Sequence, residues 1–182
     1  MRINRDNTRA VIIDVQERLL PHIDRWEATR DRIVTLIQGL NILGVPLTLT
    51  EQYPQGLGPT VPEVLSAFPV RPQPIVKSSF SCCDDKAFSE TLDQHPRDGV
   101  VLVAGIESHV CVLQTTMDLL DRGYSPVVVA DAVSSRYAMD REIALRRIEQ
   151  EGARLTTVES VLFELTRVSG TPEFKKISRL VK

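Results

Sequence analysis

Two continuous apolar runs in the second half of the chain restrict its fold more than any other feature. Residues 99–105 read Gly-Val-Val-Leu-Val-Ala-Gly, and residues 126–131 read Pro-Val-Val-Val-Ala-Asp. Such runs are typical of strands in a parallel sheet, because helices bury both faces of that sheet. A stretch with helical spacing, residues 108–122, lies between the two runs and ends before Gly123. The sequence therefore predicts a strand–helix–strand unit with parallel strands.

The same alternation continues along the rest of the chain. Shorter runs rich in β-branched residues predict further strands at residues 9–14, 45–50, 74–77 and 154–158. Helical spacing predicts helices at residues 26–43 and 139–151, and two short helices follow the last strand, up to residue 181. We therefore expect an α/β fold in which helices cover both faces of a parallel sheet.

The chain between the second and third predicted strands is rich in proline and glycine. Residues 51–62 contain three prolines and two glycines, and residues 64–74 add three more prolines. This composition predicts little regular structure in either segment. Because long loops inside a compact domain are often functional, we expect residues 51–62 to cover a substrate site.

The composition predicts one globular domain over residues 1–182, because 42% of the residues are hydrophobic and 25% are charged. The formal net charge is −2 and the basic residues are scattered, which argues against nucleic acid as a partner. No apolar stretch resembles a signal peptide or a membrane-spanning helix. The cysteines are odd in number, and the neighbours Cys82 and Cys83 are poorly placed for a disulfide. We therefore expect a cytoplasmic protein with reduced thiols and no membrane partner.

Three residues with reactive side chains end or follow predicted strands. Asp14 ends the first strand, Lys77 ends the third, and Cys111 follows the strand at residues 99–105. In open α/β sheets, ligands bind beyond the carboxyl ends of the strands. An aspartate there could take the proton of a thiol, and a lysine could stabilise the resulting charges. The spacing along the chain does not itself prove that the three residues meet.

Cys111 is the most informative of these residues, because it lies in the first turn of the helix at residues 108–122. The amide groups at a helix N-terminus favour a thiolate and could also hold an oxyanion. Each residue also has a simpler interpretation. Cysteines often only pack, aspartates often cap helices, and lysines usually lie in solvent. We assign Cys82 and Cys83 to packing.

Other kinds of site have weaker support in the sequence. His109 lies two residues before Cys111, which places it on another side of a helix, and His22 and His95 lie in polar segments. A Cys–His pair is therefore disfavoured, although the sequence leaves a distant histidine open. The chain contains no H-E-x-x-H, C-x-x-C, G-x-G-x-x-G or Walker A motif. We expect no metal and no other cofactor.

A larger set of residues resembles a known signature. Asp14-x-Gln16, Lys77 and residues 105–112, Gly-Ile-Glu-Ser-His-Val-Cys-Val, together resemble the isochorismatase-like cysteine hydrolases. Two further segments resemble, more narrowly, the isochorismatase domain-containing subgroup: residues 50–62 and 118–123. The resemblance covers nearly the whole chain. It implies a Rossmann-like, three-layer α/β/α sandwich whose six-stranded parallel sheet has the order 3-2-1-4-5-6.

The resemblance also implies roles for individual residues. Asp14, Lys77 and Cys111 correspond to the catalytic triad of the family. The peptide bond before Glu107 is expected to be cis, and the N–H groups of Glu107 and Cys111 are expected to form the oxyanion hole. The substrate is expected to contact Gln16, Tyr53, Phe80 and Ser108. Homo-oligomers are common in the family, so we expect one here.

Two departures from better-known relatives narrow the activity. Nicotinamidases carry metal-binding Asp and His residues after the second strand, where this chain has Glu-Gln-Tyr-Pro at residues 51–54. True isochorismatases typically lack the cysteine that this chain keeps as Cys111. We therefore predict hydrolysis of a small carbonyl substrate with an amide, ureido or related C–N bond. The alternatives are an acid-catalysed ether hydrolase that uses Asp14, a non-catalytic binding protein, and a peroxide-sensing thiol at Cys111.

Overall fold

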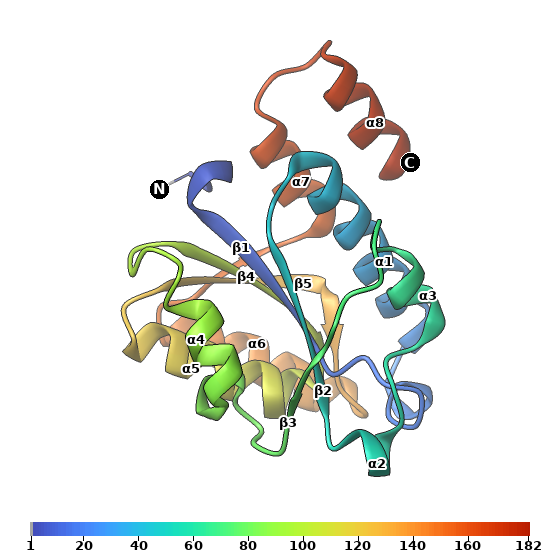
Figure 1. Ribbon diagram of the computed structural model, residues 1–182, viewed down its shortest axis with the longest axis vertical. Helices are drawn as coiled ribbons and strands as arrows, with labels where there is room; N and C mark the ends of the chain where they lie inside the picture. The colour runs from blue at the N-terminus through green and yellow to red at the C-terminus, as the bar shows by residue number, and fades with distance from the viewer. Residues whose placement is uncertain (1) are drawn as a thin grey trace.

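A six-stranded parallel sheet forms the centre of the computed structural model, which describes residues 2–182 (Figure 1). The strands are β1 Thr8–Ile13, β2 Leu47–Gln52, β3 Ile75–Lys77, β4 Val100–Ile106, β5 Ser125–Ser134 and β6 Arg154–Thr156. Their order in the sheet is β3-β2-β1-β4-β5-β6. This order confirms the α/β class predicted from the alternation and the topology implied by the resemblance.

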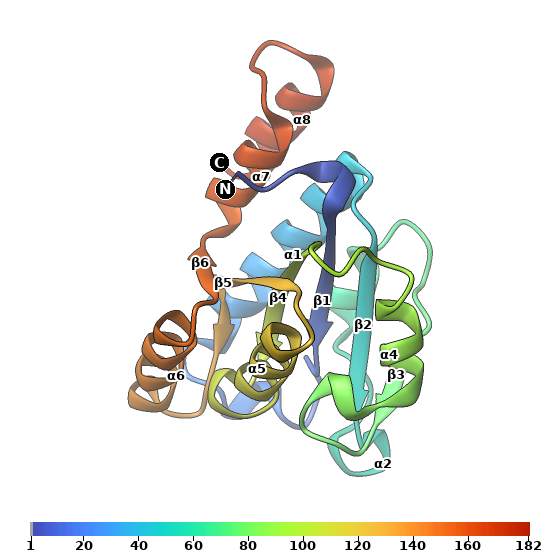
Figure 2. The ribbon, with the colours of Figure 1, turned by 90° about the vertical axis from the view of Figure 1, so that its left-hand side faces the viewer.

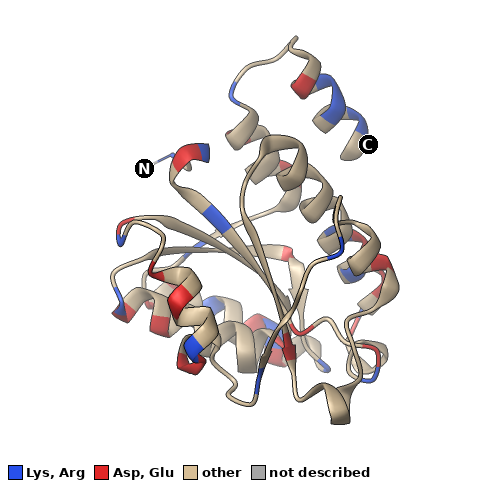
Figure 3. Ribbon diagram, viewed as in Figure 1, with Lys and Arg blue, Asp and Glu red and all other residues tan. Residues whose placement is uncertain are grey.

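Helices cover both faces of the sheet (Figures 1 and 2). They are α1 Trp26–Leu43, α2 Pro54–Leu57, α3 Pro62–Ser66, α4 Lys86–Leu92, α5 Leu113–Asp121, α6 Ala138–Gln150, α7 Val158–Thr166 and α8 Pro172–Leu180. One core layer joins the sheet to α1, α3, α7 and α8, and the other joins it to α4, α5 and α6. Charged residues lie mainly on helices and loops, and the central strands carry few (Figure 3).

Alternating side chains of the central strands enter the two core layers. In β1, Ala10 and Ile12 pack with α1, whereas Val11 and Ile13 pack on the opposite face. Successive strand residues point to opposite faces, so a strand covered on both sides needs an apolar residue at every position. All seven residues of β4 are accordingly buried.

The structure corrects several predicted boundaries in the first half of the chain. The second strand, predicted at residues 45–50, lies at Leu47–Gln52, so Glu51 and Gln52 belong to the sheet rather than to a loop. The prediction of little regular structure in residues 51–62 and 64–74 was wrong for α2 and α3. Each of these short helices begins at a proline, which is favoured in the first helical turn because its missing N–H needs no partner there.

The helix predicted at residues 108–122 has two parts. Its first part, Ser108–Val112, is a π-helical turn in which the Val112 N–H donates to the Glu107 carbonyl oxygen. The second part is α5. The wider turn places Cys111 within a short irregular segment between β4 and α5. In the other strand of the predicted unit, β5 continues beyond residue 131 to Ser134.

The carboxyl ends of the parallel strands bring residues far apart in sequence to one edge. Asp14 follows β1, Gln52 ends β2, Lys77 ends β3 and Glu107 follows β4. Gly105 permits a close approach just before this edge, since a Cβ atom on Gly105 would lie 2.1 Å from the Ile13 carbonyl oxygen. Within residues 2–182, no helix combines the length and the apolar character that crossing a membrane requires.

We expect Gly105→Ala to lower the free energy of unfolding by about 3 kcal/mol or more, because the new methyl group would force β1 and β4 apart. Gly123→Ala is the matched control. Gly123 also has a positive φ, 84°, but nothing lies within 4 Å of its added Cβ, so a loss of about 1–2 kcal/mol is expected. Urea unfolding measures both values, and equal losses would contradict the close-approach argument.

Candidate active site

A buried ion pair between Asp14 and Lys77 lies at the carboxyl edge of the sheet. The Lys77 Nζ atom is 2.6 Å from Asp14 Oδ2, and both side chains are fully buried. The Thr50 hydroxyl donates to the other oxygen, Asp14 Oδ1, at 2.7 Å. Asp14 has a φ of 54°, because the chain turns sharply where β1 ends. The carboxylate is therefore held on both oxygens by residues from β2 and β3.

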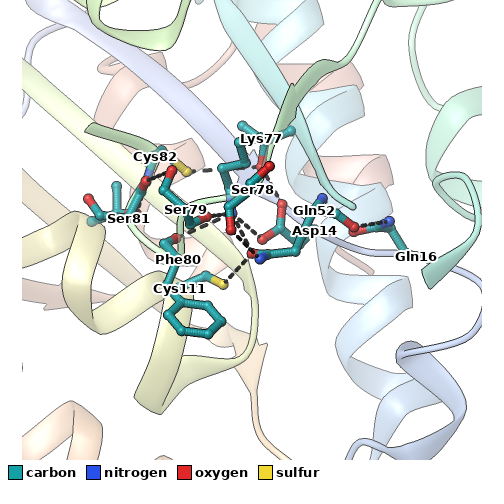
Figure 4. A network of polar contacts seen from close by, with 12 residues as sticks. Asp14, Gln16, Gln52, Lys77, Ser78, Ser79, Phe80, Ser81, Cys82 and Cys111 are labelled. Carbon is teal, nitrogen blue, oxygen red and sulfur yellow. Dashed lines mark hydrogen bonds and ion pairs between the residues drawn. The ribbon is translucent and has the colours of Figure 1, made fainter. Parts of the chain in front are cut away.

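Acceptors surround the ammonium group of Lys77 (Figure 4). Besides Asp14, Nζ donates to Gln52 Oε1 at 3.1 Å and to the carbonyl oxygens of Ser79 and Phe80 at 3.1 and 3.2 Å. Burial is the largest single effect and would lower the pKa of Lys77, but the charge of Asp14, the Cys82 and Cys111 side chains and the hydrogen bond to Asp14 together outweigh it, so this pKa lies above its ordinary value. Lys77 therefore stays a cation in the interior.

Cys111 lies beside this pair with only 6% of its surface exposed. Its Sγ atom is 3.5 Å from Gln52 Oε1. Burial raises the pKa of the Cys111 thiol, and the charge of Asp14 and a hydrogen bond with it add to this rise, while Lys77 opposes it. The expectation that the helix N-terminus would favour a thiolate was therefore wrong. The reason is that burial and the neighbouring carboxylate outweigh Lys77, so the thiol keeps its proton.

Gln52 joins the three predicted residues, and the sequence analysis missed it. Its Oε1 accepts from both Lys77 and Cys111, and its Nε2 donates to the Ser78 carbonyl oxygen at 2.9 Å. The available signal is its position at the carboxyl end of a strand, but the composition of residues 51–62 predicts a loop there. The correct end of β2 would have placed Gln52 beside Lys77, with which it pairs in the sheet.

A cavity of about 150 Å³ opens beside the thiol. Its walls come from five separate segments of the chain and comprise Leu19, Gln52, Leu57, Phe80, Glu107, Val110, Cys111 and Arg136. Leu57 belongs to α2, so the segment expected to cover the substrate site contributes one wall. Half of its lining residues are apolar, and of its polar residues Gln52 contacts the thiol.

The predicted substrate-contacting residues occupy different environments. Phe80 lines the cavity and is 54% exposed, whereas Tyr53 is 59% exposed and does not line it. Gln16 is fully buried, and its side chain bonds to the carbonyl oxygens of Gln52 and Gly58 and to the Gln52 N–H. Ser108 is also fully buried, and its hydroxyl has no hydrogen-bond partner within residues 2–182.

Glu107 and Arg136 form an ion pair at the cavity wall. The Glu107 carboxylate accepts from the Arg136 backbone N–H at 3.1 Å and from its Nε at 3.2 Å. Glu107 follows β4, and the peptide bond between Ile106 and Glu107 is cis, as the resemblance implied. Arg136 was missed in the sequence, although it follows the last strand of the predicted strand–helix–strand unit.

The remaining candidates lie outside this group. The His109 Nδ1 is 3.0 Å from Ser135 Oγ, and its Nε2 is 3.8 Å from Asp140, so the ring makes contacts on the α6 side. Cys83 is buried in the core beside α4, in keeping with a packing role. Cys82 is the exception among these candidates, because its Sγ atom is 4.0 Å from the Thr50 hydroxyl oxygen and it therefore lies next to the site. Over residues 2–182, His, Cys, Asp and Glu side chains nowhere gather in threes as a metal site requires.

Comparison with known proteins identifies the family. The model of the isochorismatase domain matches residues 8–160. The chain belongs to the isochorismatase family. Isochorismatase domain-containing protein 2 from Macaca fascicularis is 43% identical over 171 residues, which cover 94% of this chain and 81% of that protein.

Solved structures place this isochorismatase family member among several differently described proteins. The MAR1 ribonuclease of Caenorhabditis elegans has a TM-score of 0.92 at 40% identity and covers 100% of this chain and 92% of its own. YcaC from Pseudomonas aeruginosa, with hexane-2,5-diol and covalent acrylamide, has a TM-score of 0.88 at 25% identity, covering 97% and 89%. YcaC from Escherichia coli, an octameric hydrolase of unknown specificity, has a TM-score of 0.90 and covers 99% and 90%; at 23% identity it shows the fold alone.

We expect Lys77→Met to lower the free energy of unfolding by about 3–5 kcal/mol, because it leaves the Asp14 carboxylate buried and unpaired. The double variant Asp14→Asn/Lys77→Met should recover much of this loss, since it removes both charges. Lys86→Met is the control. Lys86 is 89% exposed, so its loss should stay within about 0.5 kcal/mol in the same urea titrations. A double variant less stable than Lys77→Met would contradict the ion-pair argument.

The buried thiols make stability depend on alkaline pH. Burial raises the pKa of Cys82 and Cys83 to about 12, from an ordinary 9.0, and raises that of Cys111 as well. Above pH 9 the unfolded chain therefore releases thiol protons that the folded chain keeps, and the free energy of unfolding falls as pH rises. Each thiol contributes a slope of up to about 1.4 kcal/mol per pH unit. Urea titrations from pH 7 to pH 10.5 should show this fall, and Cys83→Ala should make it shallower; a flat profile would contradict the assignment.

Proposed function

We propose that this isochorismatase family member hydrolyses a small carbonyl compound at an amide, ureido or related C–N bond, with Cys111 as nucleophile. The observation that carries the proposal is the position of Cys111 in the lining of a cavity of about 150 Å³, where Gln52 Oε1 accepts from both the thiol and Lys77 of the buried Asp14–Lys77 pair. Buried titratable groups that perturb one another beside a cavity are typical of catalytic sites. Asp14, Lys77 and Cys111 would act together as the triad.

The first step transfers a proton from Cys111 to Asp14. Because the pKa of the thiol is raised, the proton is expected to leave only as sulfur attacks a carbonyl carbon. Sulfur forms a bond to that carbon, and the carbonyl π electrons move to its oxygen. The N–H groups of Glu107 and Cys111 are proposed to hold this oxyanion, as the family resemblance implies.

The second step breaks the C–N bond. The oxyanion collapses, Asp14 returns its proton to the leaving nitrogen, and a thioester on Cys111 remains. Water then attacks the thioester with Asp14 as the base, which releases the acid and restores the thiol. Lys77 keeps its charge throughout and stabilises the Asp14 carboxylate whenever it is unprotonated. Gln52 orients the thiol through Oε1.

The size of the cavity limits the substrate. Leu19, Leu57, Phe80 and Val110 supply apolar walls, so a small substrate with an apolar portion fits best. Of the other predicted substrate contacts, Tyr53 lies outside the cavity lining. Gln16 accepts a hydrogen bond from the Gln52 N–H, and Ser108 has a buried hydroxyl group. The structure of YcaC from Pseudomonas aeruginosa with covalent acrylamide supports a small amide as a suitable probe.

The proposal also concerns the oligomeric state of the protein and a second candidate substrate. A homo-oligomer, which the family resemblance implies, stays a prediction for this chain. The MAR1 ribonuclease of Caenorhabditis elegans makes RNA a second substrate to test. The net charge of −2 and the small cavity favour a small molecule over a polynucleotide. A cytoplasmic location stays a prediction.

We expect Cys111→Ala to reduce turnover of small amides and ureido compounds by about 10²-fold or more, because the nucleophile is lost. Ammonia release from a substrate panel measures the rate, and acrylamide labelling read by peptide mass spectrometry reports Cys111 without a substrate. Cys83→Ala is the matched control, since Cys83 is a buried thiol outside the cavity lining, and it should leave both readouts unchanged.

Other outcomes would support the alternatives. Undiminished turnover in Cys111→Ala, with loss in Asp14→Asn, would contradict covalent catalysis and support acid-catalysed hydrolysis. No turnover of any compound and no acrylamide adduct on Cys111 would support a non-catalytic protein. Cleavage of RNA that survives Cys111→Ala would place the activity at another site.

A further inference from the structure

Residues 118–123, which resemble a segment of the isochorismatase domain-containing subgroup, have no part in the proposed chemistry. Asp118 lies on α5, and Arg122 follows at its C-terminal end. Neither residue lines the cavity beside Cys111. Both instead contact the loop at residues 78–84, which connects β3 to α4. Because this loop also contacts Lys77, residues 118–123 can influence the position of that lysine.

The loop supplies half of the acceptors around Lys77. Nζ donates to Asp14 and Gln52, and also to the carbonyl oxygens of Ser79 and Phe80 at 3.1 and 3.2 Å. Residues 78–81 form neither helix nor strand, so no ladder of backbone hydrogen bonds fixes these two carbonyl groups. Their positions therefore depend on the side chains that anchor the loop.

Three residues of the α5 segment anchor the loop. The Ser81 hydroxyl donates to Asp118 Oδ2 in a short hydrogen bond, and Ser81 is 2% exposed. The Cys82 N–H donates to Thr115 Oγ1 at 3.0 Å. Arg122 donates to the Cys83 carbonyl oxygen. A hydrogen bond from Ser79 Oγ to the Ser81 carbonyl oxygen, at 2.8 Å, continues the connection toward Lys77.

The same helical segment carries the nucleophile. Cys111, Thr115 and Asp118 are spaced by four and three residues, the spacing at which side chains lie on one side of a helix. One end of the segment therefore positions the thiol, and the next two turns hold the loop whose carbonyl groups bind Lys77. The distance between thiol and ammonium depends on this one segment.

We propose that Asp118 is a positioning residue that holds the 78–84 loop through Ser81 and thereby fixes Lys77 beside Asp14 and Cys111. The effect of Asp118 on the thiol rests on the proposed function, whereas its effect on Lys77 does not. Asp118 touches neither the thiol nor the cavity, so it acts only through the loop. The residues that resemble the subgroup here serve to build the triad.

The first experiment measures the accessibility of Lys77 in the full chain by acetylation with a small N-hydroxysuccinimide ester, quantified by peptide mass spectrometry. The Lys77 side chain is fully buried, so its labelling should be slow relative to Lys86, which is 89% exposed. Asp118→Ala should speed Lys77 labelling roughly tenfold, the factor expected when a hydrogen bond to a charged group no longer opposes local opening. Asp118→Asn, which keeps an acceptor oxygen, should stay within about twofold of the wild type.

Two further variants control this experiment. Asp121→Ala removes an exposed carboxylate from the same helix and should leave Lys77 labelling unchanged. Ser81→Ala removes the same hydrogen bond from its other end without changing a charge, together with the bond that the Ser81 hydroxyl accepts from the Cys83 N–H. It gives an answer if Asp118→Ala does not fold. Unchanged Lys77 labelling in Ser81→Ala, or in a folded Asp118→Ala, would overturn the proposal.

The second experiment measures iodoacetamide alkylation of Cys111 against pH. Lys77 lowers the pKa of this thiol, so displacing it in Asp118→Ala should slow alkylation at pH 8 by about three- to tenfold, which corresponds to a half to one pH unit. In a Lys77→Met background, Asp118→Ala should change the rate by less than about twofold. An equal slowing in both backgrounds would show that Asp118 acts through α5 rather than Lys77, and would overturn the proposal.

The two experiments separate this inference from the proposed function. If Asp118→Ala exposes Lys77 while Lys77→Met leaves Cys111 alkylation unchanged, Asp118 positions the lysine but the triad does not operate as proposed. If Lys77→Met slows Cys111 alkylation while Asp118→Ala leaves Lys77 labelling unchanged, the proposed triad is supported and the positioning role of Asp118 is wrong.

Discussion

The buried ion pair between Asp14 and Lys77 is the interaction on which the site depends. Two charges without access to water require partners on every side, because an unpaired buried charge costs several kcal/mol. Thr50, Gln52 and the carbonyl groups that follow β3 supply these partners. The same contacts fix the carboxylate that raises the pKa of Cys111. Stability and proposed reactivity therefore rest on one group of hydrogen bonds.

A parallel sheet is well suited to building such a group. Its strands deliver their carboxyl ends to one edge, so residues 14, 52, 77 and 107 come to that edge although connections that contain helices separate them in sequence. Close strand packing at Gly105 keeps two of these ends together. The apolar strands behind the edge exclude water from the ion pair, which strengthens the attraction between its charges.

The alternation of strands and helices predicted the sheet and its helical layers, and strand ends marked Asp14, Lys77 and Cys111 as candidates, because both are local signals. That these three residues belong together was implied only by the family resemblance. The sequence did not predict Gln52, whose role depends on where β2 ends, or Arg136, which reaches Glu107 from another strand. Gln16 was expected to contact the substrate, but its amide is used by backbone groups. The protonation of Cys111 also escaped prediction, since it reflects burial and a neighbouring charge rather than the helix that follows.

Residues 54–59, which comprise α2 and the two residues after it, form one wall of the cavity through Leu57. The way this wall is attached has a consequence for how such a site changes during evolution. Gln16 binds the Gly58 carbonyl oxygen, and the N–H groups of Glu17 and Arg18 bind the carbonyl oxygens of Pro59 and Leu57. All of these contacts use the main chain of the wall. Its side chains, including Leu57, are therefore free to vary without loosening the attachment, and the fold can diversify in the compounds it accepts while its reaction centre stays intact.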